Sequence, residues 1–549
     1  MLAAMPVPPT SPADRDETCR TGASPRNRGD ACPGALRLHS AADGALARIR
    51  LPAGLLTARQ AEVLAGLAGE LGDGHLDLTS RGNLQLRGLP SDCGAVLGAR
   101  LRAAGLLPSD AHERVRNLVA SPLSGLDGSG YADVQAWARD LDRLLCANPD
   151  ITALSGRFLF GLDDGRGDVA ALDPDVTLIA EEGGRAVLRY GRGPAGLRIP
   201  AADAPRAAVL AAEHFLGTLR AHDATAWRVK DLAPQHRPAL GALADRLAEA
   251  GIRAEPTATT PTGGPTVCGA PTGAGPDGGG SADTGPPAAG PTHGPTPSLA
   301  AAAEPGAVAE PASVAEPGAV AGPGPVAELG AMAGPASATE PGPAAGPGAV
   351  DGPGGRCALS VMAPLGRLTV AQWRLLARTA AEAGTGELRV TPWRGIVVPG
   401  LTPGAAPARL AALADAGLVT SPASPWHRAG ACAGRPGCAK SLTDVRADAA
   451  AALTGARPGG PRALPVYWSG CERRCGHPSD GPWVDVLATA DGYRVAVRTG
   501  TPDTARTAPH AVAPETAQEL ADAVATARTT ATTTAAATAA PPPGTTRTT

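Results

Sequence analysis

The sequence has few aromatic side chains, no long apolar run and almost no net charge. Aromatic residues make up 3% of its 549 residues, so a buried core must be built mainly from Ala, Val and Leu. No apolar run is long enough to span a membrane, and the N-terminus lacks a basic segment followed by an apolar one. The net charge of -3 favours neither nucleic acid nor an anionic membrane as a partner. We therefore expect a cytoplasmic protein that binds neither.

Glycine and proline are abundant, with 71 and 56 copies, and they are concentrated in one part of the chain. Residues 255–355 consist largely of Pro, Gly, Ala, Ser and Thr. A segment of this composition cannot bury enough apolar surface to offset the entropy lost on ordering. The sequence therefore predicts a disordered linker over 255–355, a disordered leader over 1–30 and a disordered tail over 526–549.

The same order of patterns occurs on both sides of this linker. Residues 31–110 read as strand, helix, strand, turn and strand, and residues 356–425 repeat that order. A second pair of similar units follows, over 111–254 and 426–525. An internal repeat of this kind predicts a pseudo-twofold molecule, with a site that receives one turn from each half. Matched positions are the helix N-caps Thr57 and Thr369, the turn residues Thr79 and Thr391, and, after a shift of one residue, Arg81 and Arg394.

The most specific chemical signal is a set of four cysteines. Cys432 and Cys438 stand in CAGRPGC, and Cys471 and Cys475 stand in CERRC. Because the cytoplasm is reducing, the ten cysteines of the chain favour thiolate and metal chemistry over disulfides. Four thiolates can hold either a 4Fe-4S cluster or a tetrahedral zinc ion. Gaps of five and three residues are unusual for zinc and favour the cluster, with zinc and unrelated thiols as alternatives.

Several motifs resemble the sulfite and nitrite reductase family. They are the spacing of the four cysteines, TSRGNLQL at residues 79–86 and RNLV at residues 116–119. Within that family, CPGALRLH at 32–39, TPWRG at 391–395 and the short ordered length resemble the precorrin-3B synthases of aerobic cobalamin biosynthesis. The resemblance implies an α+β fold with duplicated ferredoxin-like half-domains and a duplicated domain that binds a cluster and a tetrapyrrole.

The resemblance also implies a reaction. Precorrin-3A would be hydroxylated by dioxygen and closed to the lactone precorrin-3B, with a 4Fe-4S cluster on Cys432, Cys438, Cys471 and Cys475. It further implies a mononuclear non-haem iron, and electrons from reduced pyridine nucleotide through a ferredoxin or a flavoprotein. No histidine pattern identifies ligands for that second iron, so the catalytic residues stay unassigned.

Two alternatives stay open. The first is a siroheme-dependent sulfite or nitrite reductase, from which the chain departs at Gly82, where those reductases commonly have Gln. The second is a protein without turnover, which would either transfer electrons or use zinc to stabilise its fold.

Basic residues near the repeated motifs are the candidates for tetrapyrrole binding. A uroporphyrin-derived macrocycle is rimmed by carboxylates, and the planar guanidinium of Arg can bind a carboxylate through two parallel hydrogen bonds. By resemblance, Arg81 and Arg116 correspond to residues that hold siroheme carboxylates in the reductases. The full candidate set is Arg81, Asn83, Gln85, Arg116, Asn117, Arg157, Arg394 and Lys440.

Overall fold

The structure is a computed structural model, and it describes residues 32–257, 346–457, 463–478, 481–499, 506–507 and 516–538, the side chains of the last range only to 529. The expected leader and residues 258–345 of the expected linker lie outside the described residues. Both linker boundaries were set too wide, because the residues that flank this gap form strands. Strand β11 (Glu255–Pro256) pairs with β10 (Leu197–Pro200), and β12 (Gly348–Asp351) pairs with β13 (Cys357–Met362).

Two ferredoxin-like half-domains are present, as the repeat predicts. The first contains β1 (His39–Ala41), β2 (Gly44–Ile49), β3 (Leu55–Thr57), α1 (Ala58–Glu70), β4 (His75–Leu78), β5 (Leu84–Leu89) and α2 (Gly94–Ala103). The second contains β12, β13, β14 (Arg367–Thr369), α6 (Val370–Ala383), β15 (Glu387–Val390), β16 (Gly395–Leu401) and α7 (Ala406–Asp415). The strand orders are β1-β2-β5-β4-β14 and β12-β13-β16-β15-β3, so each sheet includes one short strand from the other half. This exchange ties the halves together.

Local sequence explains why α1 and α6 begin where they do. Each has a Thr at its N-cap, and that Thr exchanges hydrogen bonds with a Gln three residues later, which completes a capping box. The same Gln side chain then donates to a distant carbonyl, from Gln60 to Ala104 and from Gln372 to Ala416. The N-cap predictions for Thr57 and Thr369 are therefore confirmed.

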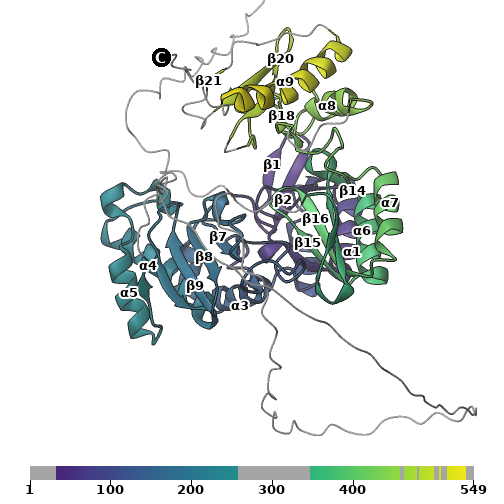
Figure 1. The fold of residues 1–549 in the computed structure, drawn as a ribbon. Coiled ribbons are helices and arrows are strands. Elements are labelled where there is room, and N and C mark those ends of the chain that lie inside the picture. The colour runs from purple at the N-terminus through teal and green to yellow at the C-terminus, as the bar shows by residue number, and fades with distance from the viewer. Residues whose placement is uncertain are drawn as a thin grey trace, which may run out of the picture. The chain divides into compact units, whose positions relative to one another are not determined.

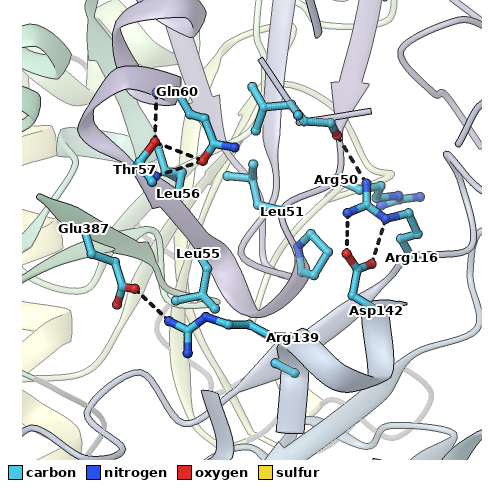
Figure 2. A pocket seen from close by; sticks show the side chains of 14 residues that line it. Arg50, Leu51, Leu55, Leu56, Thr57, Gln60, Arg116, Arg139, Asp142 and Glu387 are labelled. Carbon is cyan, nitrogen blue, oxygen red and sulfur yellow. Dashed lines mark hydrogen bonds and ion pairs between the residues drawn. The ribbon is translucent and has the colours of Figure 1, made fainter. Parts of the chain in front are cut away.

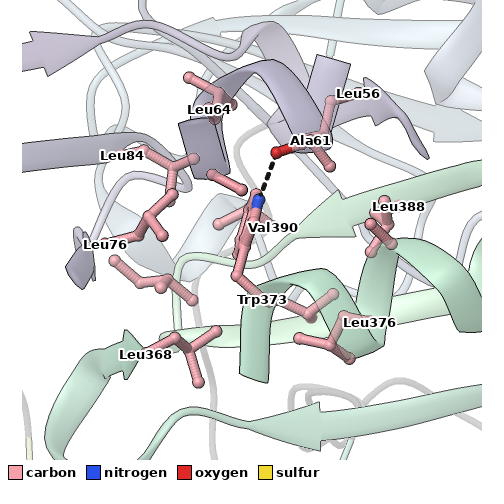
Figure 3. Close-up of a cluster of buried hydrophobic side chains, with 14 of the residues drawn as sticks. Leu56, Ala61, Leu64, Leu76, Leu84, Leu368, Trp373, Leu376, Leu388 and Val390 are labelled. Carbon is pink, nitrogen blue, oxygen red and sulfur yellow. Dashed lines mark hydrogen bonds between the residues drawn. The ribbon is translucent and has the colours of Figure 1, made fainter. Parts of the chain in front are cut away.

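Helices α1 and α6 pack against each other at the pseudo-twofold axis. Trp373 Nε1 donates to Ala61 O at 2.7 Å, and these two residues are 312 positions apart, as Thr57 and Thr369 are. A residue that contacts its own repeat counterpart must lie close to the axis that relates the repeats. Figure 3 shows Trp373 there, among buried leucines from both halves. The two half-domains therefore share one hydrophobic core.

The two repeated turns share one backbone register. Thr79 N donates to Asn83 O at 2.9 Å, and Thr391 N donates to Gly395 O at 2.8 Å. Within these turns, Gly82 and Arg394 occupy the same left-handed position, with φ of 65° and 60°. The expected shift of one residue was wrong: Arg394 is the counterpart of Gly82, and Trp393 is the counterpart of Arg81. Arg81 and Arg394 are therefore not equivalent positions of the repeat, and their side chains have different neighbours.

The second pair of units is also duplicated. The first contains β6 (Leu118–Ala120), α3 (Val134–Ala147), β7 (Phe160–Asp163), β8 (Val176–Glu181), β9 (Arg185–Tyr190), β10, α4 (Ala204–Ala221), α5 (Leu240–Glu249) and β11. The second contains β17 (Ala429–Ala431), α8 (Val445–Leu453), β18 (Val466–Ser469), β19 (Trp483–Thr489), β20 (Gly492–Thr499), β21 (Arg506–Thr507) and α9 (Ala517–Thr538). In each sheet three parallel strands are followed by an antiparallel fourth. Figure 1 shows α4 and α5 side by side next to β8 and β9.

Two further observations concern helices. Helix α9 runs through residue 526, so the expected start of a disordered tail there was wrong. No helix among the described residues combines the length and the apolarity that a membrane crossing needs.

Candidate thiol and arginine site

Parallel pairing of β17 with β18 brings the two cysteine pairs together. Cys432 directly follows β17, and Cys471 lies just beyond β18, so both are at the same edge of the sheet. Cys432 N donates to Trp468 O at 2.9 Å, and Gly470 N lies 3.3 Å from Cys432 Sγ. These bonds join the loop of the first pair to the loop of the second.

All four thiols lie near one another. Burial raises the pKa of Cys475, and the thiols of Cys471, Cys432 and Cys438 add to that rise. Four neighbouring thiols are a donor set that could hold either a 4Fe-4S cluster or a zinc ion.

Neighbouring side chains hold the thiol loops in place. Tyr467 donates its hydroxyl to Cys475 O at 2.6 Å, and burial raises the pKa of Tyr467 to about 12, so it stays a neutral donor. Arg446, on α8, donates to Cys432 O at 3.2 Å. Asp444 caps the same helix by accepting from Arg446 N and Ala447 N at 3.2 Å.

The corresponding sheet edge of the first half carries carboxylates and a serine, Ser121, at the position of Cys432. Ser121 N donates to Leu162 O at 3.0 Å and its hydroxyl oxygen accepts from Asp164 N at 3.2 Å, which repeats the bonds of Cys432. The ligand atoms of Asp163, Asp164 and Asp168 lie within 4.8 Å of one another and are buried. Burial and then the charge of Asp163 raise the pKa of Asp168 to about 7. Only the second half therefore offers thiols at this sheet edge.

A second feature is a group of four arginines, Arg48, Arg81, Arg157 and Arg228, which we call the arginine cluster. Burial and then the nearby Arg228 lower the pKa of Arg81 to about 10, while Asp175 and Cys32 oppose that shift. Asp175 pairs with Arg228 at 2.8 Å, and no ion pair with Arg81 occurs among the described residues. Positive charge is therefore in excess, which suits an anionic ligand.

Aromatic stacking places Arg157 next to the loop that carries Arg228. Its guanidinium carbon lies 4.3 Å from the ring centroid of Trp227, the residue before Arg228. Sequence reasoning found Arg81 and Arg157 but missed Arg48 and Arg228. Arg48 had one available signal, since it lies on a strand that alternates polar and apolar residues. Arg228 had none, because only the fold brings its loop to this place.

One polar sheet face connects the arginine cluster to the thiol loops. Arg48, Gln85 and Asp77 stand side by side on β2, β5 and β4, and Arg48 Nη2 donates to Gln85 Oε1 at 3.3 Å. Asp77 forms an ion pair with Arg446 at 3.0 Å. Two residues beyond Gln85, Arg87 donates to Gly437 O at 2.6 Å, between the first two cysteines. We call this surface of β2, β5 and β4 the polar sheet face.

Three of the predicted ligand-binding residues have hydrogen-bond partners within the protein. Asn83 Oδ1 accepts from Leu51 N at 2.9 Å, and its amide donates to Asn117 Oδ1 at 3.2 Å. Asn117 Nδ2 in turn donates to Phe158 O at 3.0 Å. Arg116 donates to both carboxylate oxygens of Asp142 at 2.7 and 2.6 Å, beside a cavity of about 230 Å³ (Figure 2). Their polar groups are therefore paired within the protein, and their role in ligand binding stays a prediction.

The remaining candidates lie in three places. Gln85 contacts the arginine cluster, because Arg48 Nη2 donates to its Oε1. Lys440 is exposed on the loop after Cys438. Arg394 lies beside the other thiol loop, where its Nη2 is 3.4 Å from Gly476 O.

Fold and site together define a class: a duplicated α+β protein in which a thiol-bearing sheet edge meets a polar, arginine-lined sheet face. Residues 39–103 and 351–416 match the nitrite/sulfite reductase ferredoxin-like half domain. The chain therefore carries two half-domains of that kind.

Comparison with known proteins gives particular relatives. The chain is 35% identical over 127 residues to a ferredoxin–nitrite reductase of Synechococcus elongatus, covering 22% of this chain and 25% of that protein. It is 31% identical over 157 residues to a precorrin-3B synthase of Sinorhizobium sp, covering 28% of this chain and 33% of that one. The matched segments thus span only a quarter to a third of these relatives.

A solved structure extends the similarity of fold. The Mycobacterium tuberculosis NirA protein superposes with a TM-score of 0.57 at 18% identity, and the superposition covers 87% of this chain and 79% of that chain. The arrangement of duplicated half-domains is therefore common to both proteins.

Proposed function

We propose that this protein is an oxidoreductase that binds a uroporphyrin-derived tetrapyrrole against the polar sheet face and a 4Fe-4S cluster at its four cysteines. One observation carries the proposal: Arg48 and Gln85 stand on the same sheet as Arg87, which donates to Gly437 O in the loop of the first cysteine pair. A flat macrocycle laid on that face would place its carboxylates on the arginines and its ring toward the thiols.

The residues divide this work by their chemistry. Arg81 and Arg48, which lack ion-pair partners among the described residues, bind ring carboxylates, and Arg228 and Arg157 add positive charge in the same cluster. Cys432, Cys438, Cys471 and Cys475 hold the cluster, which supplies single electrons when bound. The ion pair between Arg446 and Asp77 and the bond from Arg87 to Gly437 fix the thiol loop over the sheet.

For the reaction, we favour hydroxylation of precorrin-3A by dioxygen and closure to the lactone precorrin-3B. A ferredoxin or flavoprotein would pass electrons from reduced pyridine nucleotide, and a mononuclear non-haem iron stays part of this proposal. Three observations support it: the CPG and TPWRG motifs, the similarity to a precorrin-3B synthase, and the position of Gly82. A Cβ at Gly82 would lie 2.9 Å from Val390 O, so position 82 presents no side chain to a ligand.

A second candidate is a siroheme-dependent nitrite or sulfite reductase. The similarity to ferredoxin–nitrite reductases of several organisms favours it. The same arginine cluster and thiols would then hold a resident siroheme in place of a precorrin substrate.

One experiment separates the candidates. The full chain is purified without oxygen, and its iron, labile sulfide and absorption spectrum are measured before incubation with precorrin-3A, dioxygen and a reductant. We expect a cluster spectrum and a product heavier than precorrin-3A by one oxygen atom. A siroheme absorption band with methyl-viologen-dependent nitrite or sulfite reduction would select the second candidate. Zinc without labile sulfide would contradict both.

A separate experiment tests whether the arginine cluster binds the ring carboxylates. Arg81→Gln removes a buried cation that lies near a second cation, Arg228. An anionic ligand would offset both the burial and the repulsion. We expect roughly tenfold to hundredfold weaker binding of precorrin-3A, because a hydrogen bond to a charged group contributes about 1.5–3 kcal/mol. Fluorescence titration under anaerobic conditions measures this change. The control is Arg409→Gln on α7, whose partner is Glu382, and equal weakening in both variants would contradict the assignment.

A further inference from the structure

Arg394 adopts a backbone conformation that does not suit it. Its φ of 60° lies in the left-handed region, and the first half fills the equivalent position with Gly82. A residue with a Cβ atom pays about 1–2 kcal/mol for this conformation, so glycine would be the stabilising choice. Strain of this kind is characteristic of residues whose side chain has a function, which directs attention to what Arg394 contacts.

The Arg394 side chain extends toward the thiol loops, and two glycines lie against it. A Cβ on Gly366 would collide with Arg394 Cδ, and one on Gly430 would lie 3.0 Å from Nη1. At the end of the side chain, Nη2 is 3.4 Å from Gly476 O, the residue after Cys475. Two glycines from different elements thus leave room for one guanidinium.

The Arg394 guanidinium lies beside the loop that bears Cys475. Its guanidinium carbon lies 5.8 Å from the ring centroid of Tyr467, and the Tyr467 hydroxyl donates to Cys475 O. Cys475 is the one exposed thiol of the four. Among the described residues no carboxylate pairs with Arg394, so its positive charge is not neutralised there.

We propose that Arg394 raises the reduction potential of the cluster held by the four cysteines. A guanidinium keeps its charge at every pH at which proteins fold, and a fixed cation near a thiolate-bound cluster stabilises the form that carries the added electron. The step is the transfer of one electron from an external reductant such as dithionite, and no bond is formed or broken. This inference rests on the proposed function in that it requires a cluster at this site.

The test uses full-length protein reconstituted with iron and sulfide without oxygen. Arg394→Gln removes the charge but keeps a polar side chain, Arg394→Lys keeps the charge, and Arg394→Gly restores the residue that the first half uses. Each variant is titrated with dithionite, and the reduced fraction is followed by electron paramagnetic resonance. Arg409→Gln is the control for loss of a cation elsewhere in the same half-domain.

We expect equal cluster content in all variants. The Gln and Gly variants should be at least tenfold harder to reduce, which is about 59 mV more negative for one electron. The Lys variant and the control should stay near the parent protein. The Gly variant should also melt at a higher temperature, because it relieves the strained turn.

Two results would overturn the inference. One is a potential that does not change in Arg394→Gln, which would show that the charge is not felt by the cluster. The other is loss of the cluster in all three variants, Arg394→Lys included, which would show that Arg394 only supports the fold. Failure of the proposed function looks different, because the parent protein would then contain no labile sulfide before any titration.

Discussion

Single cysteines in this protein differ by their surroundings. Cys93 and Cys357 are buried in the apolar core of the half-domains, where Cys357 Sγ lies 3.5 Å from Leu401 O. The four cysteines of the thiol loops lie instead at a sheet edge, beside backbone amides and arginines.

This contrast gives a prediction for the cluster. Changing any one of Cys432, Cys438, Cys471 and Cys475 to Ser should remove most of the iron and labile sulfide, because a hydroxyl is a poor ligand for these irons. Metal and sulfide analysis after anaerobic purification measures the loss. Cys93→Ser and Cys357→Ser should retain both elements. If they lose the cluster to the same extent, the ligand assignment is wrong.

Asp168 provides a prediction about pH. Burial raises its pKa to about 7, above its unfolded value, so the folded state favours the protonated form and stability falls as pH rises from about 4 through 7. Asp168→Asn should therefore match the parent near pH 4 and exceed it at pH 8 by on the order of 1–4 kcal/mol.

Urea unfolding at the two pH values measures this difference. The matched control is Asp140→Asn, an exposed position on α3, which should change stability little at either pH. A gain of the same size at pH 4 would show that the effect is not caused by titration of Asp168.

Among the elements, α9 shows how one side chain can dock a helix. Arg528 is buried, and its guanidinium donates to Leu464 O at 2.9 Å and to Pro425 O and His427 O at 2.6 Å. These carbonyls belong to the segments that precede β17 and β18. Helix α9 is thereby joined to the sheet whose edge bears the thiols.

Loss of this contact should loosen the C-terminal unit. Arg528→Met keeps the apolar stem but leaves three carbonyls without a donor, and we expect a loss of about 2–4 kcal/mol. Thermal unfolding and protease sensitivity near α9 measure the change. Arg457→Met, at a neighbouring exposed position, should have little effect. Equal losses would mean that the three carbonyl contacts contribute nothing specific.

Element positions could be predicted where the signal is local. The Thr N-caps of α1 and α6 were correct because a capping box needs only residues three apart. Helix α9 was missed beyond residue 526 because its Thr and Ala residues show no strong apolar stripe, and its contact through Arg528 spans 103 residues to Pro425. Local patterns cannot show such a contact.

At the scale of the whole molecule, the pseudo-twofold axis passes through a shared core. Trp373 is fully buried there and binds a carbonyl of the opposite half. Trp373→Ala should cost about 3–5 kcal/mol, and both half-domains should lose stability together because they share that core. Calorimetry should show one transition of the ferredoxin-like region at a lower temperature.

A matched variant tests whether the loss of stability comes from the shared core. Arg374 pairs with Glu62 at 2.7 Å across the same helix interface, but both side chains are substantially exposed. Arg374→Met should therefore change stability by less than about 1 kcal/mol. Two separate transitions in Trp373→Ala would instead show that the halves fold independently.

The sequence by itself determined the duplication and the four thiols, because both depend on residue order and spacing, which folding does not change. Only the tertiary structure decided which polar side chains have partners within the protein. It places Arg394 in a left-handed conformation beside Gly476, pairs Arg116, Asn83 and Asn117 inside the scaffold, and brings Arg48 and Arg228 near Arg81. Long-range strand pairing sets these outcomes, because it fixes which charged groups find partners.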